Sequence, residues 1–150
     1  MSLIEFTEPA VLDELTEIVT EMLDGIVEAS IPDGYIQPVA GYESQIAQAT
    51  VVIQGADPCK LTIRLPASVC MGLASAMLDE APEDLTVEDA CAMLSELTNV
   101  LGGSVKSIVE EETSLGIPKA SVAQSEDFAP LEDCVFVDHS LGVFQVRLGK

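Results

Sequence analysis

The feature that most constrains the fold is the apolar periodicity of residues 89–108. Its apolar side chains recur every three or four residues, which places them on one side of an α-helix: Ala90, Met93, Leu94, Leu97, Leu101 and Ile108. Such a face is stable only when it is buried, so the sequence predicts a long helix packed on the core. Thr86 followed by Asp89 resembles a capping box and marks the start of this helix, which we expect to run to about Glu111.

Two polar residues stand on the opposite side of this predicted helix. At about 100° per residue, Glu96 and Asn99 lie one turn apart and face solvent. Ala92 and Gly103 extend the same stripe a turn before and a turn after them, so almost no side chain flanks the two polar groups. The backbone of a partner protein could therefore approach closely there.

The same stretch contains residues that do not favour a helix. Asn99 is the only asparagine in the chain, and Gly102 and Gly103 follow it. Asparagine and glycine both destabilise a helix interior relative to alanine. Unfavourable residues inside a strongly periodic helix indicate positions chosen for something other than helix stability. The alternative is an ordinary solvated face, because an exposed Glu and Asn at this spacing are common.

The composition is that of one domain without a membrane span. With 150 residues, 48% of them hydrophobic, and a mean hydropathy of +0.35, the chain can bury one sizeable core, so we expect a single domain over residues 1–150. No segment reaches the roughly 18 uninterrupted apolar residues of a membrane helix. The first residues include acids where a signal peptide would have bases. We therefore expect a cytoplasmic protein.

The charge balance excludes some partners. The formal net charge is −20, from 26 acidic and 6 basic residues, and no Lys or Arg occurs before Lys60. Direct contacts with nucleic acid or with an anionic membrane surface need clustered cations, so we expect neither. Such a charge could steer the basic surface of a partner protein. A general bias of the proteome toward acidic residues is an equally good explanation.

The cysteines and the histidine do not suggest a catalytic or metal site. Cys59, Cys70, Cys91 and Cys134 are scattered among apolar neighbours and resemble small core residues. His139 is the only histidine and lies in an expected turn after a strand. The sequence therefore predicts no bound metal and no catalytic triad.

The rest of the chain alternates helices with strands. The predicted helices are residues 9–29 and 67–78, and the predicted strands are residues 46–54, 59–65, 120–123, 134–137 and 143–148. Residues 59–65 alternate apolar with polar, which indicates a sheet with one face in water. This order predicts an α+β fold, with a largely antiparallel sheet and long helices packed on one side. An acidic helix followed by strands occurs twice, which hints at an internal pseudo-repeat.

These features together resemble the CheC/CheX/FliY family of bacterial chemotaxis phosphatases. The similarity extends from about Gly41 to the end of the chain. It is carried by four short motifs: Glu96-Leu97-x-Asn99 with Gly103, Asp89-Ala90, Leu65-Pro66-Ala67, and Leu115-Gly116-Ile117-Pro118. Because the chain has one Glu-x-x-Asn motif, it is more similar to the single-site CheX type than to two-site CheC.

The resemblance implies a function for the exposed stripe. In this family the two polar side chains enter the active site of a phosphorylated CheY-type response regulator. Glu96 would form an ion pair with the regulator's lysine, and Asn99 would hold the attacking water in line with the aspartyl phosphate. Ala92, Thr98 and Gly103 would contact the partner. No cofactor is implied for this chain, and the Mg²⁺ belongs to the regulator.

Three points stay open at this level. Thr98 stands where family members often have Gly, so we expect a β-branched side chain on the docking face, narrowing partner choice or hindering insertion. A catalytically silent relative that binds a signalling or flagellar-switch partner is the alternative function. A homodimer is also open, with Leu73, Met77 and the final strand as contact candidates, because the second helix has more apolar surface than one sheet face needs. Burial within the monomer core explains the same residues equally well.

Overall fold

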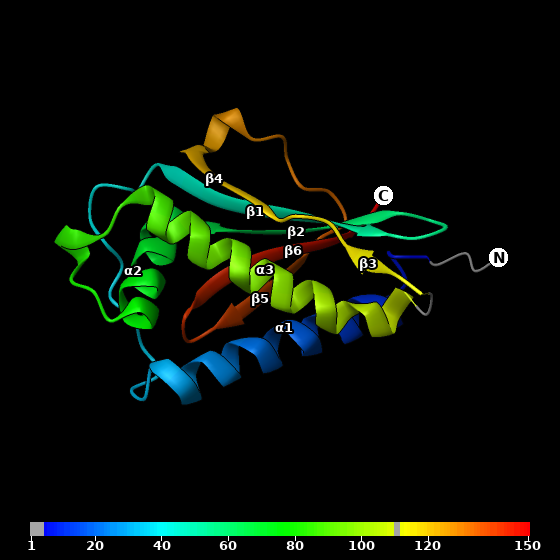
Figure 1. The fold of residues 1–150 in the computed structure, drawn as a ribbon, viewed down its shortest axis with the longest axis horizontal. Coiled ribbons are helices and arrows are strands. Elements are labelled where there is room, and N and C mark those ends of the chain that lie inside the picture. The colour runs from blue at the N-terminus through cyan, green and yellow to red at the C-terminus, as the bar shows by residue number, and fades with distance from the viewer. Residues whose placement is uncertain (1–4, 110–111) are drawn as a thin grey trace.

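A computed structural model describes residues 5–109 and 112–150. It shows two layers, a β-sheet and three helices that lie along one face of it (Figure 1). The helices are α1 (Pro9–Ser30), α2 (Ala67–Leu78) and α3 (Val87–Val109). Short 3₁₀ turns occupy Pro82–Asp84 and Ser125–Asp127. Within the described residues, none of the helices is both long and apolar enough to cross a membrane.

Over the described residues the sheet has six strands, and every pairing between them is antiparallel. Their order is β3-β1-β2-β6-β5, and β4 also pairs with β1. The strands are β1 (Gln45–Gln54), β2 (Cys59–Pro66), β3 (Ser114–Leu115), β4 (Lys119–Gln124), β5 (Val135–His139) and β6 (Gly142–Gly149). The predicted α+β fold, with helices on one side of an antiparallel sheet, is confirmed. The pseudo-repeat stays a prediction.

The register of the strands brings the apolar residues into rows beneath the helices. Ala49 pairs with Ile63, and Ile63 pairs with Val146 on its other side; all three side chains are 0% exposed. In the next pair of strands, the fully buried Phe144 lies opposite Val137. Because side chains alternate between the faces of a strand, this register turns every second residue of the central strands toward α1, α2 and α3.

The opposite face of the sheet is not open to water at its centre, which corrects the prediction from residues 59–65. Thr62 and Arg64 of β2 point away from the helices and are only 8% and 9% exposed. Residues 125–134 connect β4 at one edge to β5 at the other, and Phe128 in this connection lies 5.2 Å from the Arg64 guanidinium carbon. Arg64 Nε also donates to Gln48 Oε1 at 2.8 Å. The charged group is thus buried with partners of its own.

The predicted boundaries of the main elements agree with the structure to within one or two residues. The helix over 67–78 matches α2, and the first helix extends to Ser30. The strand β3 was not predicted, because two residues carry no periodicity. The predicted end of the third helix at Glu111 lies outside the described residues.

The structure removes one of the three candidates for a homodimer contact. Leu73 is 0% exposed and lies in the core, so it cannot contact a second copy. The final strand, β6, pairs with β2 over residues 145–149 and with β5 over residues 142–146, so strands cover most of its backbone on both sides. Met77 is partly exposed, and β6 also has exposed or half-buried positions, among them Val143 at 47%. A homodimer itself stays a prediction.

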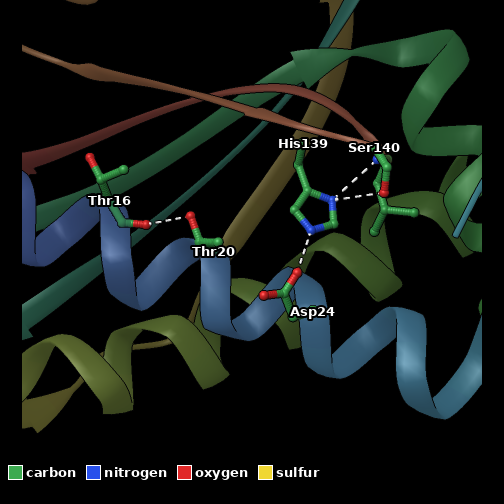
Figure 2. Close-up of polar contacts among 6 residues, drawn as sticks. Thr16, Thr20, Asp24, His139 and Ser140 are labelled. Atoms are coloured by element: carbon green, nitrogen blue, oxygen red, sulfur yellow. Dashed lines mark hydrogen bonds and ion pairs between the residues drawn. The ribbon is translucent and has the colours of Figure 1, made fainter.

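One polar cluster ties α1 to the end of the sheet. His139 Nε2 lies 2.7 Å from Asp24 Oδ1 of α1, and the backbone N–H of Leu141 donates to His139 Nδ1 at 3.2 Å (Figure 2). Since Nδ1 accepts, the ring carries its proton on Nε2, which can donate to the carboxylate. The imidazole is only 10% exposed. The β5–β6 hairpin thereby holds one flank of α1, and α3 packs on the helix elsewhere.

Candidate functional site

The helix that carries the candidate site begins at a capping box. The backbone N–H of Thr86 donates to Asp89 Oδ2 at 3.1 Å, and the N–H of Asp89 donates to Thr86 Oγ1 at the same distance. This reciprocal pair satisfies two donors that a helix start leaves free. Glu88 and Asp89 in the first turn and Lys106 near the last turn also suit the helix dipole. The predicted start of the helix is confirmed.

The inner face of α3 fixes how the helix is rotated about its axis. Ala90, Leu101 and Val105 are 0% exposed and Leu94 is 1% exposed. They belong to the buried core, and α3 contacts β1, α1 and α2. Because this row is buried over nearly the whole helix, the orientation of the opposite face is set by the core.

The outer face presents the predicted residues to solvent. Glu96, Asn99, Ala92 and Gly103 are all exposed. With a rise of about 1.5 Å per residue, Glu96 and Asn99 start about 4.5 Å apart along the axis on one stripe. Among the described residues, neither side chain has a hydrogen-bond or ion-pair partner. The geometry therefore matches what the spacing predicted, with both polar groups available to another molecule.

Thr98 does not lie on that face, and its predicted contribution to docking is wrong for this structure. Its side chain is 0% exposed, and its hydroxyl donates to the carbonyl of Leu94 at 2.7 Å. At about 100° per residue, a position between Glu96 and Asn99 turns toward the core. The β-branched side chain therefore packs inside the molecule, and nothing of it stands between the two exposed groups.

The two neighbouring glycines serve different purposes. A Cβ at Gly102 would lie 3.1 Å from a methyl group of Leu115 and 3.4 Å from one of Val51, so a small residue lets α3 approach β1 and β3 closely. A Cβ at Gly103 would meet nothing within 4 Å. The packing of Gly102 was not predicted, because the sequence analysis noted this residue only as one that disfavours a helix. Only Gly103 belongs to it.

The exposed groups can bind a cation and orient a small polar molecule. A carboxylate accepts charged hydrogen bonds, and a primary amide both donates and accepts without titrating near neutral pH. A thiol nucleophile has little support here. Burial raises the pKa of Cys70 to about 12, and burial also raises the pKa of Cys91 on α3 itself.

A groove beside the site was not predicted from the sequence. It lies between α1 and α3 and has a volume of ≈ 730 Å³. Val100, 56% exposed and one turn after Glu96, forms part of its wall. An apolar residue one turn after Glu96 was the available signal, but the groove itself depends on how the two helices pack.

The comparison with protein families shows the family of the chain. The model of the family described as "Chemotaxis phosphatase CheX" matches residues 47–137, which is more than half of the chain and includes the whole exposed stripe. The chain belongs to the CheX family. No curated protein sequence matches it.

Solved structures of CheX and related proteins share the fold. The chemotaxis protein CheX of Desulfovibrio desulfuricans is 15% identical, with a TM-score of 0.66 over 93% of this chain and 97% of that one. A chain in the CheX–CheY–BeF3–Mg²⁺ complex of Borrelia burgdorferi is 19% identical, with a TM-score of 0.57 over 98% of both. Thermotoga maritima FliY is 13% identical, with a TM-score of 0.59 over 99% of this chain and 86% of that one. At such low sequence identities the similarity shows a shared fold and no more.

Proposed function

We propose that this CheX-family protein dephosphorylates a CheY-type response regulator, using Glu96 and Asn99. The observation that carries the proposal is that both side chains are exposed, one turn apart, on a helix whose rotation is fixed by its buried face. The family match supports a phosphatase in general. The complex of Borrelia burgdorferi CheX with CheY supports a receiver as the partner.

Asn99 orients the attacking water in this proposal. Hydrolysis of an acyl phosphate passes through a loose transition state, so most of the catalytic effect comes from position and electrostatics. The receiver supplies the phosphoryl group, its Mg²⁺ and a cation. An amide can accept a hydrogen bond from the water and donate one to a neighbouring oxygen, which holds the water in line without acting as a base.

Glu96 fixes the register of docking. Its carboxylate pairs with the lysine of the receiver's active site, and this charged hydrogen bond strengthens as the interface excludes water. The exposed Ala92 and Gly103 leave room for the receiver's backbone on either side of the two polar groups. A catalytically silent module that binds the same partner is the alternative.

The test is phosphate release from a phosphorylated CheY-type receiver of the same organism, at low and moderate salt. We expect the wild type to accelerate decay and Glu96→Gln to raise KM, because the ion pair is lost. Glu88→Gln is the matched control, since it removes one exposed carboxylate from the same helix. Binding without any acceleration by the wild type would favour the silent module, and neither binding nor acceleration would reject both functions.

A further inference from the structure

The groove between α1 and α3 lies beside the proposed site and is lined mainly by other residues. Ile26 and Leu97 form its floor and are only 8% and 6% exposed. Ile18 and Met22 of α1 line one wall and Val100 of α3 lines the other. The groove spans Leu97 to Ser107 on α3, which is about 15 Å at 1.5 Å per residue. It can hold the apolar side chains of about three helical turns.

Small residues keep the groove open. The lining includes Gly25 and Ala29 on α1 and Ser104 and Ser107 on α3. A Cβ at Gly25 would meet nothing within 4 Å. An apolar groove of this kind between two helices is the form that receives an amphipathic helix of another protein. Because Val100 comes one turn after Glu96, a partner bound at Glu96 would reach the groove without a gap.

The charged residues of α1, which forms one wall of the groove, are all acidic. Glu14, Glu17, Glu21 and Glu28 are exposed along α1, and Glu21 lines the groove itself. None of these four carboxylates has an ion-pair partner within residues 5–109 and 112–150. Among the residues that the structure describes, no Lys or Arg lines the groove. The surface is therefore apolar at its centre and negative along its α1 side.

We propose that this groove is the second docking element for the same phosphorylated receiver, and that it takes an amphipathic helix of the receiver with Lys or Arg along the edge that faces α1. This inference rests on the proposed function. It also explains how a chain of net charge −20 can approach an acidic receiver active site, because the attraction along α1 offsets the repulsion at the centre.

A second copy of this chain fits the groove less well than the receiver does. It would bring a net charge of −20 of its own against a wall of unpaired carboxylates. Like charges placed against each other oppose association and suppress the wrong partner. The negative charge beside the groove thus favours a basic helix. A receiver can present such a helix, whereas the long helices of this chain are acidic.

The first experiment fills the groove. Gly25→Leu places a side chain in open space and exchanges glycine for a better helix former, so the fold is retained. We expect KM for the phosphorylated receiver to rise about tenfold with kcat unchanged, as for loss of one apolar contact used in binding alone. Ala10→Leu, which introduces the same side chain at an exposed position of α1 outside the groove, is the control and should leave both constants as they are.

The second experiment reverses the charge of α1. The double variant Glu17→Lys with Glu21→Lys should raise KM at low salt, and the difference from wild type should shrink as salt is added. Glu126→Lys with Asp138→Lys changes the net charge equally at exposed positions outside α1 and α3 and should have a much smaller effect. Equal effects of the two pairs would mean that only the overall charge matters and would overturn the proposal.

Binding measured without turnover separates this inference from the proposed function. The probe is the receiver with Mg²⁺ and BeF3, titrated by calorimetry into each variant. If Gly25→Leu leaves the turnover of the receiver unchanged, the groove is not a docking element, and the proposed phosphatase function still stands. If Gly25→Leu weakens binding of the receiver but the wild type shows no turnover, the groove is a docking element and the proposed phosphatase function is rejected. If the wild type sediments as a dimer and Gly25→Leu sediments as a monomer, the groove binds a second copy of this chain instead of the receiver.

Discussion

The inner and outer faces of α3 differ in what holds their side chains. On the inner face, Leu94, Leu101 and Val105 are at most 1% exposed and packed against the sheet and the other helices. On the outer face, Glu96 and Asn99 are exposed without partners among the described residues. The core thus determines where the outer groups point, while those groups add little to stability. A site built this way can lose its function without losing its fold, and the following variants test that separation.

Asn99→Ala should have the largest effect on function. Losing one oriented polar group of this kind costs about two to three powers of ten in rate. The Tm should not fall, because the amide is exposed and alanine is the better helix former. The measurement is phosphate release from the receiver, with a thermal melt of the same sample. An unchanged rate would show that the outer face is only a solvated surface.

Gly102→Val should have the largest effect on the fold. The added side chain would meet Leu115 and Val51 at the contact of α3 with β1 and β3. Overpacking of this kind costs about 1–3 kcal/mol, measured as the free energy of unfolding in urea. The m-value should stay the same. Stability equal to wild type would mean that this side of the helix is packed less closely than the structure shows.

Gly103→Ala is the counterpart one residue later. The new methyl group meets nothing within 4 Å, and the exchange should stabilise the helix by up to about 1 kcal/mol. Because the methyl group lies on the exposed stripe, we expect turnover of the receiver to fall even as the Tm rises. A variant that is both more stable and fully active would remove Gly103 from the docking surface.

Thr98→Val should have the smallest effect of the four. The hydroxyl bonds only to the carbonyl of Leu94, which keeps its helical hydrogen bond when the hydroxyl is gone. We expect a change in the free energy of unfolding within about 1 kcal/mol and no change in receiver turnover. A large loss of turnover at unchanged stability would return Thr98 to the docking face.

The sequence pattern predicted the features that depend on neighbouring residues of a single helix or strand. It identified α3, its capping box at Thr86 and Asp89, and the exposed positions of Glu96 and Asn99, because each depends on residues within a few turns of one another. The alternating strands β2 and β6 were predicted for the same reason. These features together with the family resemblance sufficed for the fold class.

Features that depend on how distant elements meet were not predicted. The purpose of Gly102 is visible only once β1 and β3 lie beneath it, and the contact of His139 with Asp24 joins residues 115 positions apart. The cover over the outer face of the sheet arises from the path of residues 125–134 between its two edges. The docking prediction for Thr98 was wrong for a simpler reason. Thr98 stands between two motif residues in the sequence, but its angle on the helix turns it toward the core.

The single asparagine of the chain offers the most direct test of the central claim, that the outer face of α3 enters the receiver's active site. Protein labelled with ¹⁵N in asparagine alone shows one side-chain amide group, that of Asn99, as a pair of NH2 cross-peaks at a single nitrogen shift. On addition of a receiver held in its active form by Mg²⁺ and BeF3, we expect this signal to shift or broaden, because the amide becomes buried beside the phosphoryl stand-in. A signal unchanged at saturating receiver, with binding shown in the same sample, would contradict the claim.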